Sequence, residues 1–370
     1  MKYPAMAAAL LACVGSAVAQ SNVTLYGVAD VYAESTRISG RGSLARLGSG
    51  GLTASRWGMR AIEDLGGGLK ATAVLESGIA LDNGSSLQGG RLFGRQAYVS
   101  LTSASLGEVR LGRQYSPLHY SLLFSDVDAF AVFSPIFAMY LSNGEQSRQD
   151  NQVSYWTPNF SGFSGMVAVA AGERAAVAPG AATPWIPAAG TMKRNVGGML
   201  RYQAGPIDVN VGYVQGGQEL AAGDADQRAF NVGAIYKFGA FNLGGNYWDY
   251  RNELPSGATP KVRGASIGVK VPVGPSWNFV AQVGRVEDDG REYTTGAAKA
   301  KGRNTYVNLG ANYVLSKRTD IYLRYAHIDD KNGGFNGRAT TALYGVFGPG
   351  NTLPVGGSAS TVALGLRHLF

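Results

Sequence analysis

Few residues of this chain are spaced in a way that suits catalysis or metal binding. The three histidines, His119, His327 and His368, have no metal-ligand spacing with one another. The segment Asp329–Gly334 resembles the start of a calcium-binding loop but lacks the acidic ligand that should end one. No combination of Ser, His and Asp typical of nucleophilic catalysis stands out. The sequence therefore predicts neither an enzyme nor a site for a metal or cofactor.

The first 19 residues predict a secretory signal peptide that is cleaved from the chain. Lys2 supplies a positive start, Ala5–Val14 an apolar stretch, and Ala17–Ala19 a small-residue cleavage pattern before Gln20. The apolar stretch is too short to span a bilayer as a helix. The only cysteine, Cys13, falls inside this segment, so residues 20–370 are predicted to form the mature domain without a disulfide.

Charge alone does not indicate a nucleic-acid partner. The formal net charge is +8, and removal of the segment with Lys2 leaves +7. The basic residues are spread singly among acidic neighbours and form no basic stripe, so we expect no nucleic-acid binding.

Most of the chain consists of short segments in which apolar and polar residues alternate. Long and short connections join these segments in turn. The short connections include Asp64–Gly68, Gln203–Pro206 and Leu315–Thr319, and the longer polar ones include Ser35–Gly51 and Asp330–Ala359. A closed antiparallel barrel in an outer membrane has short turns at one rim and longer loops at the other. Counting the connections in order gives sixteen strands, with both termini at the short-turn side. The sequence therefore predicts an all-β, 16-stranded antiparallel transmembrane β-barrel.

The segment Asn304–Leu315 shows the alternation clearly. Val307, Leu309 and Ala311 share one face, and Asn308 and Asn312 the other. Successive strand side chains point to opposite sides, so an apolar outside and a polar inside are expected.

Composition agrees with a barrel rather than with membrane helices. The mean hydropathy is −0.04, and the mature chain has no apolar run of about 18 residues. Tyrosine and tryptophan lie mostly near the predicted strand ends, as at a membrane interface. A secreted β-rich adhesin and an outer-membrane barrel enzyme remain as alternatives. The adhesin would not need the alternating connection lengths, and the enzyme would need a catalytic arrangement at the rim.

Several segments together resemble the trimeric general porins of Gram-negative bacteria, and most closely the beta-proteobacterial branch. The resemblance covers the whole mature chain in order and ends at Phe370. It rests on the segments Val23–Asp30, Ser55–Gly58, Glu63–Ala71, Arg95–Val99, Leu106–Gln114 and Asn151–Tyr155. It implies an outer-membrane porin, exported through the periplasm, that forms a water-filled channel for passive diffusion of small hydrophilic solutes and ions.

The resemblance also implies a third long loop that folds inward and narrows the channel. In this sequence that constriction loop is Ser116–Ser147, which is unusually apolar and carries Asp126 and Asp128. The family places a ladder of basic side chains on the wall opposite the loop. The residues expected to line the constriction are Arg56, Arg60, Lys70, Arg95, Asp126 and Asp128.

Strand alternation places Arg56 and Arg60 on one face, and Lys70 on the same face as Glu76. Alternation does not settle the direction of Arg95; the resemblance implies an inward one, and so does the cost of about 2–4 kcal/mol for a lipid-facing arginine near the midplane. Opposed rows of charge would set the ion preference, and the positive net charge favours a modest preference for anions. The partners expected are two further copies of the chain in a homotrimer, outer-membrane lipid and lipopolysaccharide, the barrel-assembly machinery, for which Phe370 would be the signal, and small hydrophilic solutes.

Overall fold

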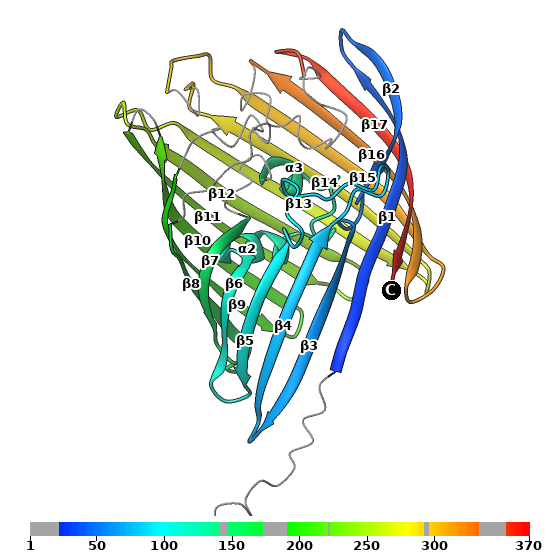
Figure 1. Cartoon of the computed structure of the whole chain (residues 1–370). Helices are drawn as coiled ribbons and strands as arrows, with labels where there is room; N and C mark the ends of the chain where they lie inside the picture. Colours follow the sequence, from blue (N-terminus) through cyan, green and yellow to red (C-terminus); the bar gives the residue numbers. More distant parts are fainter. Residues whose placement is uncertain (1–21, 141–146, 173–190, 221–222, 292–295, 333–352) are drawn as a thin grey trace, which may run out of the picture.

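The computed structural model describes residues 22–140, 147–172, 191–220, 223–291, 296–332 and 353–370. The predicted signal peptide lies outside these residues. Within them the chain forms a single antiparallel sheet and two short helices (Figure 1). The strands are β1 (Asn22–Ile38), β2 (Gly42–Ser49), β3 (Arg56–Gly66), β4 (Leu69–Gly78), β5 (Gln96–Ser103), β6 (Gly107–Tyr115), β7 (Arg148–Trp156), β8 (Phe163–Ala170), β9 (Thr191–Ala204), β10 (Ile207–Leu220), β11 (Gly223–Lys237), β12 (Asn242–Glu253), β13 (Lys261–Val273), β14 (Trp277–Asp288), β15 (Arg303–Val314), β16 (Thr319–Lys331) and β17 (Ser358–Leu369).

The sheet closes on itself where β1 pairs with β17, from Val28 opposite Leu369 to Ile38 opposite Ala359. Both β2 and β3 pair with β1, β2 along its second half and β3 along its first half. These two strands therefore occupy one position of the barrel, and the 17 strand segments make 16 barrel positions. The predicted 16-stranded antiparallel barrel is confirmed.

The first long connection differs from the expectation. The stretch Ser35–Gly51 was expected to be a loop, but it is a hairpin in which β1 continues to Ile38 and β2 returns from Gly42. Its polar composition resulted from strands that extend past the apolar band, where both faces of the sheet carry polar side chains. Near the hairpin tip, Arg37 pairs with Ser43 on one face, and the neighbouring Thr36 lies on the other face.

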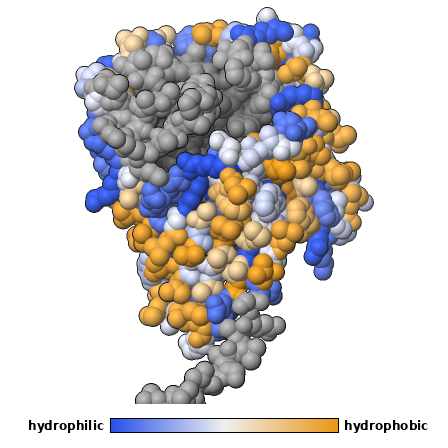
Figure 2. Space-filling model, in the orientation of Figure 1, coloured by the Kyte–Doolittle hydropathy of each residue, from blue (hydrophilic) through white to orange (hydrophobic). Residues whose placement is uncertain are grey.

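The two faces of the sheet have the predicted characters. On β15, Asn308 is fully buried inside the barrel, while its neighbour Leu309 is 47% exposed on the outside. Figure 2 shows the apolar outer side chains gathered over the lower part of the face it presents, with hydrophilic side chains more frequent above. The apolar outer face suits lipid, and the polar inner face suits a water-filled interior.

The chain end is part of the closure of the barrel. The backbone groups of Phe370 exchange two hydrogen bonds with Gly27, with N–O distances of 2.9 and 3.1 Å. The Phe370 ring covers Gly27 so closely that a Cβ there would lie 2.2 Å from the ring. Glycine at position 27 therefore makes room for the terminal aromatic ring.

The connection between β6 and β7 is Ser116–Ser147, and its described residues up to Tyr140 fold into the barrel (Figure 1). It begins with α2 (Pro117–Phe124), whose first turn is set by Pro117 and capped by the Ser116 hydroxyl, which accepts the His119 N–H at 3.1 Å. A second helix, α3 (Pro135–Tyr140), follows. Helix α2 lies against β8–β11, and α3 lies against β13–β15.

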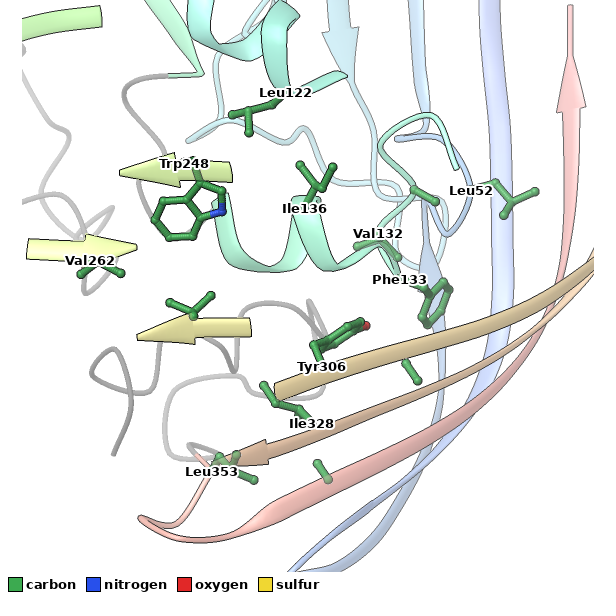
Figure 3. Packing of buried hydrophobic residues seen from close by; sticks show 14 of the residues in the cluster. Leu52, Leu122, Val132, Phe133, Ile136, Trp248, Val262, Tyr306, Ile328 and Leu353 are labelled. Atoms are coloured by element: carbon green, nitrogen blue, oxygen red, sulfur yellow. The ribbon is translucent and has the colours of Figure 1, made fainter. Parts of the chain in front are cut away.

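The apolar residues of this connection make a core inside the barrel. Leu122, Val132, Phe133 and Ile136 pack with inward side chains of the wall, including Tyr306 (Figure 3). This packing explains why so apolar a segment can lie within a polar interior, since its apolar side chains are removed from water.

Candidate functional site

Two arginines from separate parts of the chain meet at one carboxylate on the inner wall, and a third arginine joins them through a tyrosine. Arg95 Nε donates to Glu76 Oε1 at 2.7 Å, and Arg56 Nε lies 3.5 Å from Glu76 Oε2. Arg95 Nη2 and Arg148 Nη2 both donate to the Tyr115 hydroxyl, at 2.5 and 2.9 Å. Three guanidinium groups against one carboxylate leave this cluster positively charged. We call Arg56, Glu76, Arg95, Tyr115 and Arg148 the basic cluster.

The members of the basic cluster differ in exposure. Arg95 is 5% exposed, whereas the Arg56 side chain keeps 24% of its surface accessible and Arg148 is half-buried. Arg95 therefore holds Glu76 and Tyr115 in place, while Arg56 and Arg148 carry the accessible positive charge. The structure brings together the predicted Arg56 and Arg95. Sequence reasoning missed Arg148; its one available signal was its position directly after the predicted loop.

Tyr115 links the basic cluster to the inward connection. The Tyr115 ring stacks on His119 of α2, with ring centroids 4.0 Å apart. Arg148 on β7 places its Cζ 4.5 Å from the centroid of the Tyr115 ring. Burial first, and then Arg148 and Arg95, lowers the pKa of His119 well below its ordinary value. The imidazole is therefore neutral at pH 7 and adds no charge to the site.

The two predicted acidic residues are bound to the opposite wall. Asp128 receives both hydrogen bonds from Arg324 Nη2 on β16, each at 3.2 Å, and Arg324 is fully buried. Asp126 accepts from Gln282 Nε2 on β14 at 2.7 Å and from the backbone N–H groups of Asp128 and Phe130. We call Asp126, Asp128, Gln282 and Arg324 the acidic anchor.

Burial shapes the chemistry of the acidic anchor. Asp126 is 4% exposed and Asp128 is 5% exposed. Burial, and then the neighbouring Asp128, raises the pKa of Asp126 to about 6. The structure therefore places both carboxylates in contact with β14–β16, and their described contacts do not include Arg56 or Arg95 on the other wall.

Hydroxyl and amide groups attach helix α2 to the wall between these two clusters. Ser121 Oγ donates to Asn210 Oδ1 at 2.6 Å and accepts from Asn231 Nδ2 at 2.8 Å. The network continues from Asn231 to Asn246 at 2.8 Å and from Ser266 to Asn246 at 2.6 Å. These neutral groups span four neighbouring strands, β10–β13, and place the helix without adding charge to the interior.

The segment between the strands β2 and β3 also supports the inward connection. The segment between β2 and β3 curls around Asp30, whose carboxylate accepts the N–H groups of Gly51, Leu52 and Thr53 at 2.8–3.0 Å. The Gly51 carbonyl then accepts the Val132 N–H at 2.9 Å. The inward connection is thus fixed to the wall on β2–β3 as well as on β14–β16.

Arg60 and Lys70 lie apart from the basic cluster. Arg60 is opposite Val74, two pairs beyond Gly58 and Glu76, and Lys70 is opposite Asp64 near the short turn. Both side chains are exposed. They share the inward face with Arg56, as the alternation predicted, but they lie progressively closer to the short-turn end.

Two further inward arginines, Arg110 on β6 and Arg201 on β9, lie on the wall near α2. Arg110 Cζ lies 5.1 Å from the Tyr98 ring and 4.8 Å from the Trp156 ring. Arg201 Cζ lies 3.8 Å from the Phe124 ring, and its Nε bonds Asp208 at 2.7 Å. Each has an acidic partner, Glu108 for Arg110 and Asp208 for Arg201, so neither adds as much net charge as the basic cluster.

The described residues lack two further features. They contain no group of three or more His, Cys, Asp or Glu side chains that could hold a metal ion. None of the described helices combines the length and apolarity needed to cross a membrane.

Comparison with known proteins gives consistent matches. Residues 5–333 match the model of the Gram-negative porin family. The chain is 33% identical to outer membrane porin protein 32 of Delftia acidovorans, over the full length of both proteins. It is 31% identical to an outer membrane porin protein of Bordetella pertussis strain Tohama I, over 94% of this chain and 98% of the relative.

Solved structures agree with these sequence matches. The anion-selective porin from Comamonas acidovorans has a TM-score of 0.78 and 28% identity, over 95% of this chain and all of that one. A trimer form of OmpT from Vibrio cholerae has a TM-score of 0.64 at 17% identity, over 95% of this chain and 99% of that one, which shows the shared fold. The barrel, the inward connection and these matches lead to one conclusion: the chain belongs to the Gram-negative porin family and is a porin of the outer membrane.

Proposed function

We propose that the water-filled channel of this porin prefers small anions, and that the basic cluster sets this preference. The observation that carries the proposal is the imbalance of charge at the cluster. Arg56 and Arg95 contact the carboxylate of Glu76, and Arg148 joins them through Tyr115, so three guanidinium groups accompany one carboxylate among the described residues. The carboxylates that could balance it, Asp126 and Asp128, are buried against the far wall. The anion-selective porin from Comamonas acidovorans, a structural relative, supports the same preference.

The expected mechanism is electrostatic and involves no chemical step. A hydrated anion that passes Arg56 and Arg148 meets two accessible positive charges held in place by Tyr115 and Glu76. Two unit charges 4 Å apart interact by about 1 kcal/mol in bulk water and by about 4 kcal/mol at an effective dielectric constant near 20. A narrowing lined by protein is closer to the second case, so a few fixed charges suffice to favour anions over cations.

Neutralising the accessible arginines tests this proposal. The double variant Arg56→Gln, Arg148→Gln should shift the reversal potential in a salt gradient toward cations, measured on single channels in planar bilayers. The matched control is Arg291→Gln, because Arg291 lies beyond β14 in an outer connection and is screened from the cluster. An unchanged reversal potential in the double variant, with channels still open, would remove the basic cluster from the selectivity mechanism.

We also propose that Ser116–Ser147 forms the constriction. Support comes from its position inside the barrel between the basic cluster and the acidic anchor. Shortening the segment that joins α2 and α3 should increase single-channel conductance. A conductance equal to that of the wild type would show that the narrowest point lies elsewhere.

We propose that residues 1–19 are a signal peptide that directs export of the chain toward the outer membrane and is then cleaved. The N-terminal sequence of the protein isolated from outer membranes should therefore begin at Gln20. A mature chain that begins at Met1 would contradict the proposal.

A homotrimer is the proposed assembly. The outward faces of β3, β4 and β5 carry Ala61, Ala71, Ala73 and Ala97, and such small side chains allow close packing between barrels. The trimer form of OmpT, an outer membrane protein of Vibrio cholerae, supports this assembly. Mild-detergent sizing and unheated gels should show a trimer, and a monomer alone would exclude it.

We infer that the chain acts as a channel and not as an enzyme, since the relatives named above are porins. Large, stepwise and persistent conductance in planar bilayers is the expected behaviour.

The proposed signal for the barrel-assembly machinery is Phe370, whose ring covers Gly27 where β1 and β17 close the barrel. Replacing Phe370 with Ser should lower the yield of folded protein in outer membranes more than replacing Leu369 does.

A further inference from the structure

The inward connection presents an apolar surface to the interior of the barrel. Between α2 and α3, Ala129 is exposed and Phe130 is partly exposed, while residues 131–133 are buried. The carboxylates expected on this surface, Asp126 and Asp128, are buried as well. A solute that passes this part of the connection therefore meets an aromatic ring and not a row of acidic groups.

An unusual backbone conformation places Phe130 at this surface. Ala129 and Phe130 have φ angles of 53° and 65°, in the left-handed region that residues with a Cβ rarely adopt. The Asp126 carboxylate holds the turn, because it accepts the N–H groups of Asp128 and Phe130 at 2.9 and 3.0 Å. The Phe130 ring thus lies at the edge of the apolar core and not inside it. Backbone strain that the surrounding contacts maintain in this way is concentrated at functional positions.

Aromatic contacts join Phe130 to the basic cluster. The Phe130 ring meets the His119 ring edge-on, with centroids 5.1 Å apart, and the Phe137 ring edge-on at 5.2 Å. His119 stacks on Tyr115, whose hydroxyl accepts from Arg148. We call Phe137, Phe130, His119 and Tyr115 the aromatic row. One end of this row is apolar and partly exposed, and the other end lies against guanidinium groups.

The charged end of the aromatic row can take up a carboxylate. Arg148 forms its described hydrogen bond with Tyr115 and not with a carboxylate, and Arg56 shares Glu76 with Arg95. Guanidinium groups bind carboxylates through two parallel hydrogen bonds. Aromatic rings favour a further ring in an offset or edge-on position, with centroids about 4.5–7 Å apart. A ligand that satisfies both ends of the row carries a carboxylate on an aromatic ring.

We propose that the constriction favours aromatic carboxylates among small anions, with benzoate as the simplest example. The proposal deepens the anion preference proposed above and rests on it. The carboxylate pairs with Arg148 and Arg56, and the ring lies against Phe130 and Phe137. Chloride and polyhydroxylated carboxylates meet only the guanidinium groups, so they are held less strongly on their way through the channel.

The other arginine–aromatic contacts near α2 do not offer the same pair of groups. Arg201 lies over the Phe124 ring, but its guanidinium is bound by Asp208 through Nε and Nη2. Arg110 lies near two aromatic rings and pairs with Glu108. Each of these guanidinium groups is already matched with a carboxylate, so they provide a comparison within the same channel.

Block of the chloride current by added anions tests the proposal on single wild-type channels in planar bilayers. Benzoate should block at about fivefold lower concentration than shikimate, which has the same carbon skeleton but a non-aromatic ring that carries hydroxyl groups. Uncharged benzamide should block at least about fivefold more weakly than benzoate, because it lacks the carboxylate. Equal block by benzoate and shikimate, or by benzoate and benzamide, would overturn the proposal. These comparisons do not depend on the folding of a variant.

The variant Phe130→Asn removes the ring, and asparagine tolerates the left-handed backbone at this position. Block by benzoate should weaken by about fivefold, while block by shikimate and the reversal potential in a salt gradient stay as in the wild type. The matched control is Phe124→Asn, since Phe124 is also a partly exposed phenylalanine of the connection and its neighbour Arg201 is bound by Asp208. Block by benzoate should change by less than about twofold in the control. Block as in the wild type by Phe130→Asn, or equal weakening in both variants, would overturn the proposal.

The double variant Arg56→Gln, Arg148→Gln separates this proposal from the anion preference itself. It should weaken block by benzoate and by shikimate alike, because both anions lose the guanidinium groups. Equal block by benzoate and shikimate in a wild-type channel that still prefers chloride to potassium would remove the aromatic row and leave the anion preference standing. A wild-type channel that prefers potassium would remove the anion preference, and this proposal with it.

Discussion

The basic cluster and the acidic anchor lie at opposite sides of the same inward connection, and they treat charge differently. In the basic cluster, Arg56 and Arg148 stay partly accessible, and the three arginines outnumber the one carboxylate, that of Glu76. In the acidic anchor, Asp128 and Arg324 are both buried and matched one to one. One side of the connection presents charge to the interior of the barrel, and the other uses charge to hold the connection in place.

This difference shows that a charged residue inside a pore need not act on the solute. A buried, paired charge is costly to separate from its partner and therefore fixes geometry. An accessible charge in excess of its partners acts on whatever passes by. Burial and pairing distinguish the two roles.

The largest effect is expected at the acidic anchor. Arg324→Gln would leave Asp128 buried without its cationic partner, which should lower the free energy of unfolding by about 3–5 kcal/mol. Denaturant unfolding of the folded protein in detergent, followed by tryptophan fluorescence, measures the change.

The matched control is Arg285→Gln, whose ion pair with Glu287 has both side chains about half exposed. An exposed pair contributes about 1 kcal/mol or less. If the two variants lost similar stability, the acidic anchor would not have the structural role assigned to it.

The sequence predicted the barrel well because strand alternation is a local property. The faces of Asn304–Leu315 followed from residue order alone, and so did the inward direction of Arg56. The pairing of Asp128 with Arg324 could not be found this way, because the two residues are 196 positions apart in the chain. Alternation gives the face of a residue but not its height in the barrel, so it could not separate Arg56 from Arg60 and Lys70.

The second prediction concerns the pH dependence of the acidic anchor. The pKa of Asp126 is raised from 3.8 to about 6 by burial and by Asp128. Between these values the folded state binds more protons than the unfolded state, so the free energy of unfolding should fall as pH rises from about 4 to about 6. The shift of about two units corresponds to about 3 kcal/mol.

The variant Asp126→Asn isolates this contribution from other titrating groups. It should show a flatter dependence of the unfolding free energy on pH between 4 and 7 than the wild type, with the difference largest above pH 6. Parallel curves for the two proteins would mean that Asp126 does not titrate in this range.

The third prediction tests the neutral attachment between the two charged regions. Gly233 on β11 faces Ser125, and a Cβ there would lie 1.9 Å from Ser125 Oγ. Gly233→Ala should therefore push the end of α2 from the wall and cost about 1–3 kcal/mol. On the outward side of β9, a Cβ at Gly198 would have its nearest contact at 3.5 Å, so Gly198→Ala is the matched control. Equal stability of the two variants would argue against close packing of α2 on the wall.

The smallest effect is expected at Arg60 and Lys70, which share the face of the basic cluster but not its position. Arg60 is four residues from Arg56 along β3, which corresponds to about 13 Å at 3.3 Å per residue. Charges in contact with water at that separation are largely screened, since the Debye length is about 8 Å at physiological ionic strength. Lys70 is farther still, because it pairs opposite Asp64 near the short turn while Arg56 pairs opposite Gly78. We therefore expect the shift of the reversal potential to be largest for Arg56→Gln, smaller for Arg60→Gln and smallest for Lys70→Gln. In 0.15 M salt, Lys70→Gln should lie close to the wild type. At lower salt, where screening weakens, the two should differ more. An equal shift for all three at 0.15 M salt would mean that selectivity depends on the summed charge of the wall, and the contrast between accessible excess charge and buried paired charge would then not explain it.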